Sequence, residues 1–231
     1  MQKKTGIEAL RLVGFLAEVS DPALKALAAA CRFAEYGAGQ LIIGHLDTSC
    51  DVLFLLEGEA RVSVYSAQGK QVSFRDIRPG GIFGEMAAID GEPRSASIEA
   101  ISDCTVAVLP QAAFIAALAS CPPLMLSVLR HLTGQVRVLT ARVFEFSTLA
   151  VRSRVHSELI RLAERTAPSR NDVVLAPAPT HQDIATRIST HREAVTREMT
   201  HLERLGIVQR QGRKLRIRDV ALLRSLLSDS E

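Results

Sequence analysis

The chain has 231 residues, of which 47% are hydrophobic and 23% charged, and its formal net charge is +3. This length allows one large domain or two ordinary ones, and the composition excludes a disordered chain. No apolar run reaches the roughly 18 residues that a membrane-spanning helix needs, and no secretory leader follows the basic N-terminus, so we expect a cytoplasmic protein with no membrane partner.

The charge is divided unevenly along the chain. Residues 1–150 carry 13 Lys+Arg and 15 Asp+Glu, a net charge of −2, whereas residues 151–231 carry 15 Lys+Arg and 10 Asp+Glu, a net charge of +5. A basic C-terminal third indicates a polyanionic partner, although a solvated, arginine-rich surface would give the same balance.

The four cysteines do not indicate a metal site. They form no Cys-x-x-Cys pair, and no histidine lies at zinc-finger spacing from them. We therefore expect no metal, and buried, reduced thiols that act as small hydrophobic side chains at Cys31, Cys50, Cys104 and Cys121.

The first 110 residues predict a helical N-terminal region followed by an antiparallel β-roll. Residues 6–33 carry apolar side chains at helical intervals, and Ser20-Asp21-Pro22 is a good start signal for a helix over 23–31. In residues 34–110, glycines and turn residues separate short apolar or alternating runs, and 67–70 is expected to be a hairpin turn. Such a pattern is typical of a roll or barrel, whose mouth can admit a ligand. The predicted strands are 52–56, 60–65, 72–74 and 105–109.

The most informative motif is residues 83–97, which read FGEMAAIDGEPRSAS. Glu85 precedes the pair Arg94-Ser95 by nine residues. A carboxylate can accept hydrogen bonds from a ribose hydroxyl, while an arginine beside a serine hydroxyl can hold an anionic phosphodiester. The small residues around them let the backbone come close to a ligand. The simpler alternative is a surface salt bridge between Glu85 and Arg94 beside a tight turn.

Residues 123–150 predict a long helix that pairs with its copy in a second chain. Apolar residues recur at alternating intervals of four and three from Met125 to Ala150, with no proline or glycine among them. This period favours a dimer over the alternative, a single amphipathic helix that covers the roll. The residues expected at the dimer seam are Leu129, Leu132, Val136, Leu139, Val143 and Phe146.

A hinge near residues 146–152 is expected to lead into a C-terminal module. A helix over 152–164 precedes a proline-containing loop over 166–179, which has room for a brief strand at 173–175. Two short helices separated by a tight turn at Ser189-Thr190 then predict a helix-turn-helix.

The ends of this helix-turn-helix carry recognisable signals. Thr180 is the expected N-cap of the first helix, in a variant capping box with Asp183, and residues 191–205 form the second helix. Residues 209–218 predict a basic hairpin, the wing, that turns at Gln211-Gly212. A purely structural three-helix domain is the alternative.

Three side chains at the start of the second helix suit the reading of bases. Arg192, Glu193 and Arg197 are expected on one face of the helix. Arginine can bind guanine O6 and N7 with two bonds, and glutamate can accept from cytosine N4. Thr180 is a further candidate DNA contact, and His191, Thr196, Arg213 and Lys214 are candidate phosphate contacts, with a solvent-facing surface position as the alternative.

Together, the 83–97 cassette and the C-terminal helix-turn-helix resemble the cyclic-AMP receptor protein (CRP/FNR) family of bacterial transcription regulators, over nearly the whole chain. The resemblance implies an α+β protein in three parts. These are an N-terminal cyclic-nucleotide-binding antiparallel β-roll with flanking helices (1–122), a central dimerisation helix and hinge (123–150), and a C-terminal winged helix-turn-helix (151–231).

The resemblance also implies a function. It predicts a regulator rather than an enzyme, with cAMP, or alternatively cGMP, as allosteric ligand. Its implied partners are double-stranded DNA with TGTGA-type half-sites, a second copy of the chain and RNA polymerase. The implied ligand contacts are Phe83, Gly84, Glu85, Met86, Ala87, Arg94, Ser95, Ala96, Leu139 and Thr140.

The purine is left open by one departure from the family. A polar pair on the central helix reaches the base in the family, whereas Leu139-Thr140 keeps a single hydroxyl. Two other functions stay open as well. One is a family member that binds DNA without a nucleotide, and the other is a cyclic-nucleotide sensor, as an enzyme or regulatory subunit, that does not touch DNA.

Overall fold

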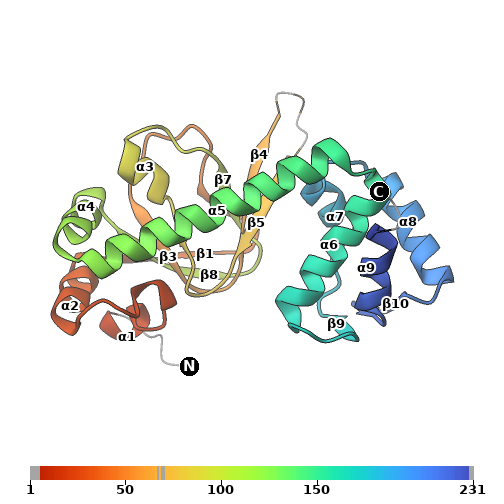
Figure 1. Ribbon diagram of the computed structural model, residues 1–231. Helices are drawn as coiled ribbons and strands as arrows, with labels where there is room; N and C mark the ends of the chain where they lie inside the picture. Colours follow the sequence, from red (N-terminus) through yellow and green to blue (C-terminus); the bar gives the residue numbers. More distant parts are fainter. Residues whose placement is uncertain (1–5, 67, 69–70, 229–231) are drawn as a thin grey trace. The chain divides into compact units, whose positions relative to one another are not determined.

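The computed structural model describes residues 6–66, 68 and 71–228, in which the chain forms two compact units, Met1–Val136 and Arg137–Glu231 (Figure 1). The three-part division at 122/123 and 150/151 stays a prediction. Of the hairpin turn predicted at 67–70, all residues but Gln68 lie outside the described part of the chain.

The first unit begins with short helices that cover one end of the β-roll. These are α1 (Ile7–Leu10), the 3₁₀ turn η1 (Gly14–Leu16) and α2 (Asp21–Ala30). The helix start predicted at Ser20-Asp21-Pro22 is correct, because Ser20 is the N-cap of α2. Leu10, Leu24 and Leu27 join a core cluster with Phe54 and Phe114 of the roll and its flanking helix, so the helices are part of the same hydrophobic core.

The roll consists of two four-stranded antiparallel sheets, with strand orders β1-β8-β3-β6 and β2-β7-β4-β5. The predicted antiparallel architecture is therefore confirmed. The strands are β1 (Arg32–Tyr36), β2 (Leu41–Ile43), β3 (Val52–Glu57), β4 (Ala60–Tyr65), β5 (Gln71–Ile77), β6 (Ile82–Phe83), β7 (Ser97–Ala100) and β8 (Cys104–Leu109).

The central strand β3 explains its own apolar run. Residues 52–56 are all buried, and alternate members belong to two different clusters: Phe54 packs toward the helices, whereas Leu55 packs between the sheets. Because side chains alternate across a strand, a strand that is covered on both faces needs apolar residues at every position. Cys104 is buried in the inter-sheet cluster, but Cys31, Cys50 and Cys121 are only partly buried, which differs from the expectation for all four thiols.

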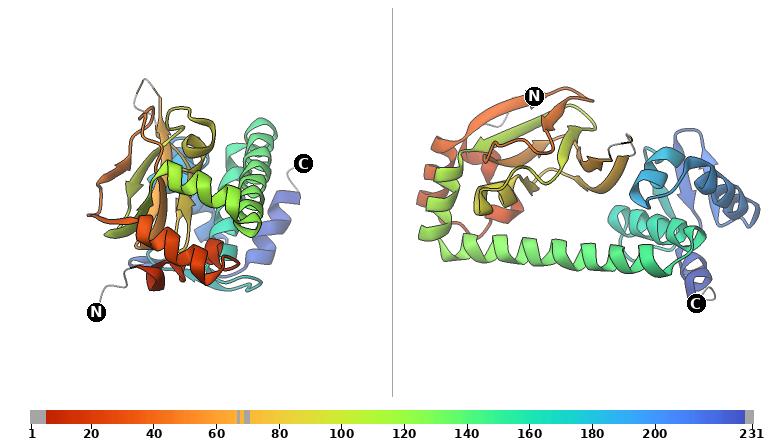
Figure 2. Two further views of the ribbon diagram at one scale, coloured as in Figure 1. Left: turned by 90° about the vertical axis from the view of Figure 1, so that its left-hand side faces the viewer. Right: turned by 90° about the horizontal axis from the view of Figure 1, so that it is seen from above.

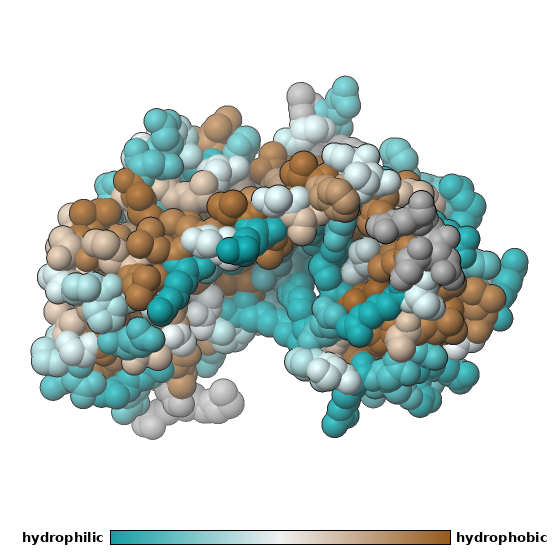
Figure 3. Space-filling view, viewed as in Figure 1, coloured by the Kyte–Doolittle hydropathy of each residue, from teal (hydrophilic) through white to brown (hydrophobic). Residues whose placement is uncertain are grey.

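Three helices complete this region of the chain. The short α3 (Glu85–Asp90) connects β6 to β7, α4 (Gln111–Ser120) follows β8, and α5 (Pro122–Thr148) is one uninterrupted helix (Figure 2). The predicted central helix is thus present, one residue earlier at its start and two earlier at its end. Apolar side chains lie along its course in the space-filling view (Figure 3). Among the described residues no single helix is long and apolar enough to cross a membrane, although α4 and α5, bent by 111°, pass that test as a pair.

The second unit is a winged helix-turn-helix. Its helices are α6 (Val151–Thr166), α7 (His181–Arg187), α8 (Arg192–Arg204) and α9 (Val220–Ser228). Its strands are β9 (Val173–Leu175), β10 (Val208–Gln211) and β11 (Lys214–Ile217), which form a sheet in the order β10-β11-β9. The brief strand at 173–175 is confirmed. Two details differ from the prediction. The wing turns at Gly212-Arg213, one residue later than predicted, because Gln211 still pairs with Lys214. The helix α9, which packs along α6, was not predicted (Figure 1).

Candidate functional site

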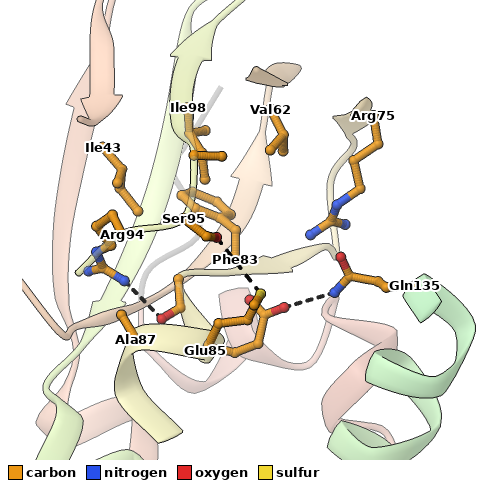
Figure 4. Close-up of a pocket in the computed structure, with 13 residues that line it drawn as sticks. Ile43, Val62, Arg75, Phe83, Glu85, Ala87, Arg94, Ser95, Ile98 and Gln135 are labelled. Carbon is orange, nitrogen blue, oxygen red and sulfur yellow. Dashed lines mark hydrogen bonds between the residues drawn. The ribbon is translucent and has the colours of Figure 1, made fainter. Parts of the chain in front are cut away.

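A pocket in the first unit lies between α3, the β2-β7-β4-β5 sheet and the first half of α5. It encloses about 450 Å³ of space not filled by protein atoms, including space that is open to solvent. Its lining combines aliphatic side chains with a few charged and polar groups (Figure 4). The lining residues are Ile43, Val62, Arg75, Phe83, Gly84, Glu85, Met86, Ala87, Arg94, Ser95, Ala96, Ile98 and Gln135.

The structure brings together eight of the ten residues predicted to contact a ligand. They are the cassette residues Phe83, Gly84, Glu85, Met86, Ala87, Arg94, Ser95 and Ala96. Leu139 and Thr140 lie further along α5, in the second unit, and their contact with a base stays a prediction.

Gly84 allows the backbone and Arg94 to approach each other closely. Its φ of 81° lies in the left-handed region, where it caps the N-terminus of α3. A Cβ atom at this position would lie 2.5 Å from Nη1 of Arg94 and 2.8 Å from the carbonyl oxygen of Asp51. Only glycine meets both the backbone and the packing requirement here.

Arg94 is buried at the wall of the pocket, with a relative exposure of 3%. Its Nη1 donates to the carbonyl oxygen of Gly84 at 2.8 Å, its Nη2 to that of Asp51 at 2.7 Å, and its Nε to Oγ of Ser49 at 3.1 Å. Burial lowers the pKa of Arg94, against the effect of nearby acidic groups, and an arginine remains a cation nonetheless. These bonds fix the guanidinium and occupy three of its five N–H groups, so two remain for a ligand.

Glu85 is a buried carboxylate that α5 holds from one side. Its Oε1 accepts from Nε2 of Gln135 at 2.9 Å and lies 3.4 Å from Nε2 of His131. Burial alone would raise the pKa of Glu85, but the hydrogen bonds from His131, Gln135 and its own backbone, together with the charge of Arg75, lower it. The group is therefore ionised, and a ligand hydroxyl can donate to it.

Glu85 and Arg94 do not form the simple salt bridge considered as an alternative. Both belong to the described part of the chain, where the partners of Glu85 come from α5 and those of Arg94 are Ser49 and two backbone carbonyls. The two charges face the same pocket instead. Ser95 completes this wall, and its hydroxyl lies 3.8 Å from Sδ of the exposed Met86.

Two polar residues of the pocket were missed at the sequence level. Arg75 comes from β5, and Gln135 precedes the seam residue Val136 on α5. Simple alternation does not mark Arg75 as inward-facing, because β5 has a bulge against β4: Ser63 pairs with Ser73 and Val62 with Arg75, which leaves Phe74 as an extra residue.

The second unit presents a candidate DNA interface. Thr180 and Asp183 form the predicted capping box at the start of α7, and Ile184, Ala185 and Ile188 are buried as expected. On α8, Arg192, Glu193 and Arg197 are exposed, and within the described ranges their side chains have no hydrogen-bond or ion-pair partner. These three side chains are therefore free to meet a base edge.

The other candidate DNA contacts fall into two groups. His191, Arg213 and Lys214 are exposed. The hydroxyls of Thr180 and Thr196 are already bonded within the protein, Thr180 to Asp183 and Thr196 to His181 and to the carbonyl oxygen of Arg192. A phosphate contact from either threonine would have to share these bonds.

Buried charged groups connect α8 to α6, and the end of α5 to α6. Nε2 of His156 on α6 lies 2.6 Å from Oε1 of Glu198 on α8, and burial lowers the pKa of His156 although Glu198 opposes it. Glu158, 1% exposed, lies 3.4 Å from Arg142 of α5 and 3.6 Å from Arg187 of α7. The end of α5 is thus tied to the first helix of the helix-turn-helix.

Comparison with known families finds a matching domain in each unit. The Cyclic nucleotide-binding domain family matches residues 33–121, and the Crp-like helix-turn-helix domain matches residues 153–226. The chain belongs to the CRP/FNR family of transcription regulators. Members of this family regulate transcription and are not enzymes, and the helix-turn-helix implies DNA binding.

Individual CRP/FNR relatives are similar at modest identity. The transcriptional regulator SdrP of Thermus thermophilus is 26% identical over 172 residues, which cover 74% of this chain and 81% of SdrP. The cAMP-activated global transcriptional regulator CRP of Escherichia coli O157:H7 is 21% identical over 147 residues, which cover 63% of this chain and 70% of that protein. A crystal structure of a CRP/FNR-family regulator from Thermus thermophilus aligns with a TM-score of 0.69 at 26% identity, covering 87% of this chain and all of the other.

The described residues contain no group of three or more His, Cys, Asp or Glu side chains that could hold a metal ion. The charged groups of the pocket are Arg75, Glu85 and Arg94.

Proposed function

We propose that this CRP/FNR-family member is a homodimeric transcription regulator that a cyclic purine mononucleotide, cAMP or cGMP, switches between states of different DNA affinity. The observation that carries the proposal is the pocket, where a fixed guanidinium and an ionised carboxylate face one cavity among small residues. A cyclic nucleotide has the matching groups, an anionic diester and a ribose hydroxyl.

In the proposed complex, Arg94 and Ser95 hold the phosphate and Glu85 accepts from the ribose hydroxyl. Two N–H groups of Arg94 remain after its three bonds to the protein, and they supply the charge-assisted contacts. Thr140, from further along α5, is the proposed contact to the base. A ligand hydroxyl would compete with Gln135 and His131 for the carboxylate of Glu85.

This competition gives the proposed gating mechanism. A ligand can shift an equilibrium only by its differential affinity for the two states. Because Gln135 and His131 belong to α5, replacing their bonds to Glu85 favours a different position of this helix segment. The charged cluster at Glu158 would pass a movement of the end of α5 to α7 of the helix-turn-helix.

Dimerisation is supported by the apolar side chains that α5 leaves uncovered in the single chain. The seam residues Leu129, Val136, Leu139 and Val143 are 54%, 62%, 45% and 64% exposed, whereas Leu132 and Phe146 are partly buried. Burying a large aliphatic side chain contributes about 1.5–3 kcal/mol, so pairing of two such helices is favourable. A two-fold dimer would read a pseudo-palindromic site with half-sites about 34 Å apart.

A gel-shift assay on a TGTGA-type palindrome, without ligand, with cAMP and with cGMP, tests the proposal. We expect a nucleotide to increase the fraction of DNA bound, and Arg94→Leu to abolish this increase. Arg192→Ala should leave nucleotide binding intact and weaken DNA selectivity. Equal binding in all three conditions would instead support the second candidate, a regulator that needs no nucleotide. That candidate is favoured by the three protein acceptors already bonded to Arg94.

A further inference from the structure

The pocket contains a second arginine that the cassette does not explain. Arg75 lies on β5, where it pairs in register with Val62 of β4, and its side chain lines the cavity. Figure 4 shows Arg94 and Arg75 entering the pocket from opposite sides, with Glu85 between them and Gln135 beside Arg75.

Most hydrogen-bond donors of Arg75 have no protein partner. In the described part of the chain, the one hydrogen bond of this side chain runs from Nη2 to the carbonyl oxygen of Ile82, at 3.4 Å. That distance is at the long end for such a bond, whereas the three bonds of Arg94 measure 2.7 to 3.1 Å. Burial lowers the pKa of Arg75, and the charge of Glu85 partly opposes this. A partly buried cation with N–H groups that lack a protein partner beside a cavity needs acceptors from a ligand or from water.

The order of charges across the pocket indicates which part of the ligand meets Arg75. This step rests on the proposed function, in which Arg94 holds the phosphate and Glu85 holds the ribose. Since phosphate, ribose and base follow one another in a nucleotide, the base lies beyond Glu85, on the side of Arg75 and Gln135. The aliphatic side chains of Val62 and Ile98, which also line the pocket, offer it an apolar surface.

We propose that Arg75 reads the base and makes the pocket selective for guanine, so that cGMP is the preferred ligand. A guanidinium has donors only, and guanine presents two acceptors, O6 and N7, that it can bind together. Adenine presents N7 beside an N6 amino donor, which would face a second donor across the contact. Gln135 does not discriminate in this way, because its amide carries both a donor and an acceptor.

Isothermal titration of the full-length protein with cGMP and cAMP tests this assignment. We expect the wild type to bind cGMP more tightly by roughly five- to hundredfold, the range expected for a two-bond arginine–guanine contact. Arg75→Met keeps the aliphatic stem and should reduce cGMP affinity to about that of cAMP, while cAMP affinity changes little. Arg78→Met is the matched control, because Arg78 is an exposed arginine on the same segment and lies outside the pocket lining.

A second measurement isolates the acceptor atom. The analogue 7-deaza-cGMP lacks N7, so it should bind the wild type more weakly than cGMP does and should bind Arg75→Met as well as cGMP does. If Arg75→Met does not fold, Arg75→Lys, which retains a charge but not the two-bond fork, replaces it in both titrations.

The outcomes separate the inference from the proposed function. Wild type that prefers cAMP, or an Arg75→Met variant that loses both nucleotides equally, overturns the assignment of Arg75 and leaves the nucleotide-gated regulator intact. Wild type that binds neither nucleotide overturns the proposed function, and the assignment falls with it.

Discussion

Replacing Gly84 with alanine should damage the pocket far more than the same change at Gly91, although both glycines flank α3 in left-handed backbone. Their φ angles are 81° and 74°. The conformational penalty for alanine is therefore nearly equal, about 1–2 kcal/mol at either position. The surroundings differ: a Cβ atom on Gly84 would lie 2.5 Å from Nη1 of Arg94 and 2.8 Å from the carbonyl oxygen of Asp51, and one on Gly91 would meet nothing within 4 Å.

The additional loss at position 84 comes from the hydrogen bonds of Arg94. The guanidinium cannot move away from the new methyl group and keep its bond to the carbonyl of residue 84, and such charged hydrogen bonds contribute about 1.5–3 kcal/mol. We expect Gly84→Ala to lower the free energy of unfolding of the first unit by about 2.5–5 kcal/mol, against about 1–2 kcal/mol for Gly91→Ala. Nucleotide affinity should fall about ten- to hundredfold in Gly84→Ala and should stay within about twofold in Gly91→Ala.

Urea unfolding followed by far-UV circular dichroism measures the stability of both variants, since the chain has no tryptophan for a fluorescence signal. Isothermal titration with cAMP and cGMP measures the affinity. Equal destabilisation by the two alanines would show that the close approach at Gly84 has no energetic role. Unchanged nucleotide affinity in Gly84→Ala would remove Arg94 from the proposed phosphate contact.

Three further changes test the dimer, the DNA interface and the buried histidine. Val136→Lys places a charge in the seam and should raise the dimer dissociation constant more than a hundredfold, about 3 kcal/mol, as measured by sedimentation analysis. The control Ala141→Lys, at an exposed position off the seam, should leave the dissociation constant unchanged. Arg192→Ala should relax selectivity at one base pair by about 1–3 kcal/mol in competition gel shifts and leave nucleotide affinity unchanged. Because burial holds the pKa of His156 below its unfolded value of 6.5, the unfolded chain binds the proton first. The free energy of unfolding of the second unit should therefore be highest above pH 6.5 and should decrease as the pH falls toward the folded pKa of His156. Thermal unfolding of His156→Gln at several pH values should not show this decrease.

The helices α2, α5, α6, α7 and α8 and most strands could be predicted because their apolar periods report local burial. The run in β3 follows from burial on both of its faces, the heptad pattern of α5 from one apolar face, and the capping box at Thr180 from neighbours in the sequence. The turn of the wing was misplaced by one residue because either register leaves a glycine in the loop, and pairing of Gln211 with Lys214 decides between them.

The polar half of the pocket could not be read from hydrophobicity, because a bulge interrupts the alternation of β5. Ser63 of β4 pairs with Ser73 and Val62 with Arg75, so Phe74, which is 39% exposed, is the extra residue of a bulge between them. A strand that borders a ligand cavity needs polar groups on its inner face, so a hydrophobic pattern alone does not identify which of its faces is the inner one.

The carboxylate of Glu85 connects the two sequence-level findings, the cassette and the long helix. One buried oxygen accepts from Gln135, which immediately precedes the seam residue Val136 on α5. A single hydrogen-bond exchange changes a free energy by only about 1 kcal/mol, which is too little to drive a complete switch. A nucleotide that also bonds to Arg94, to Arg75 and to α5 adds several such differences. The gating we propose therefore requires the ligand to contact the roll and the helix together, and a fragment that carries only ribose and phosphate should change DNA affinity by no more than about fivefold.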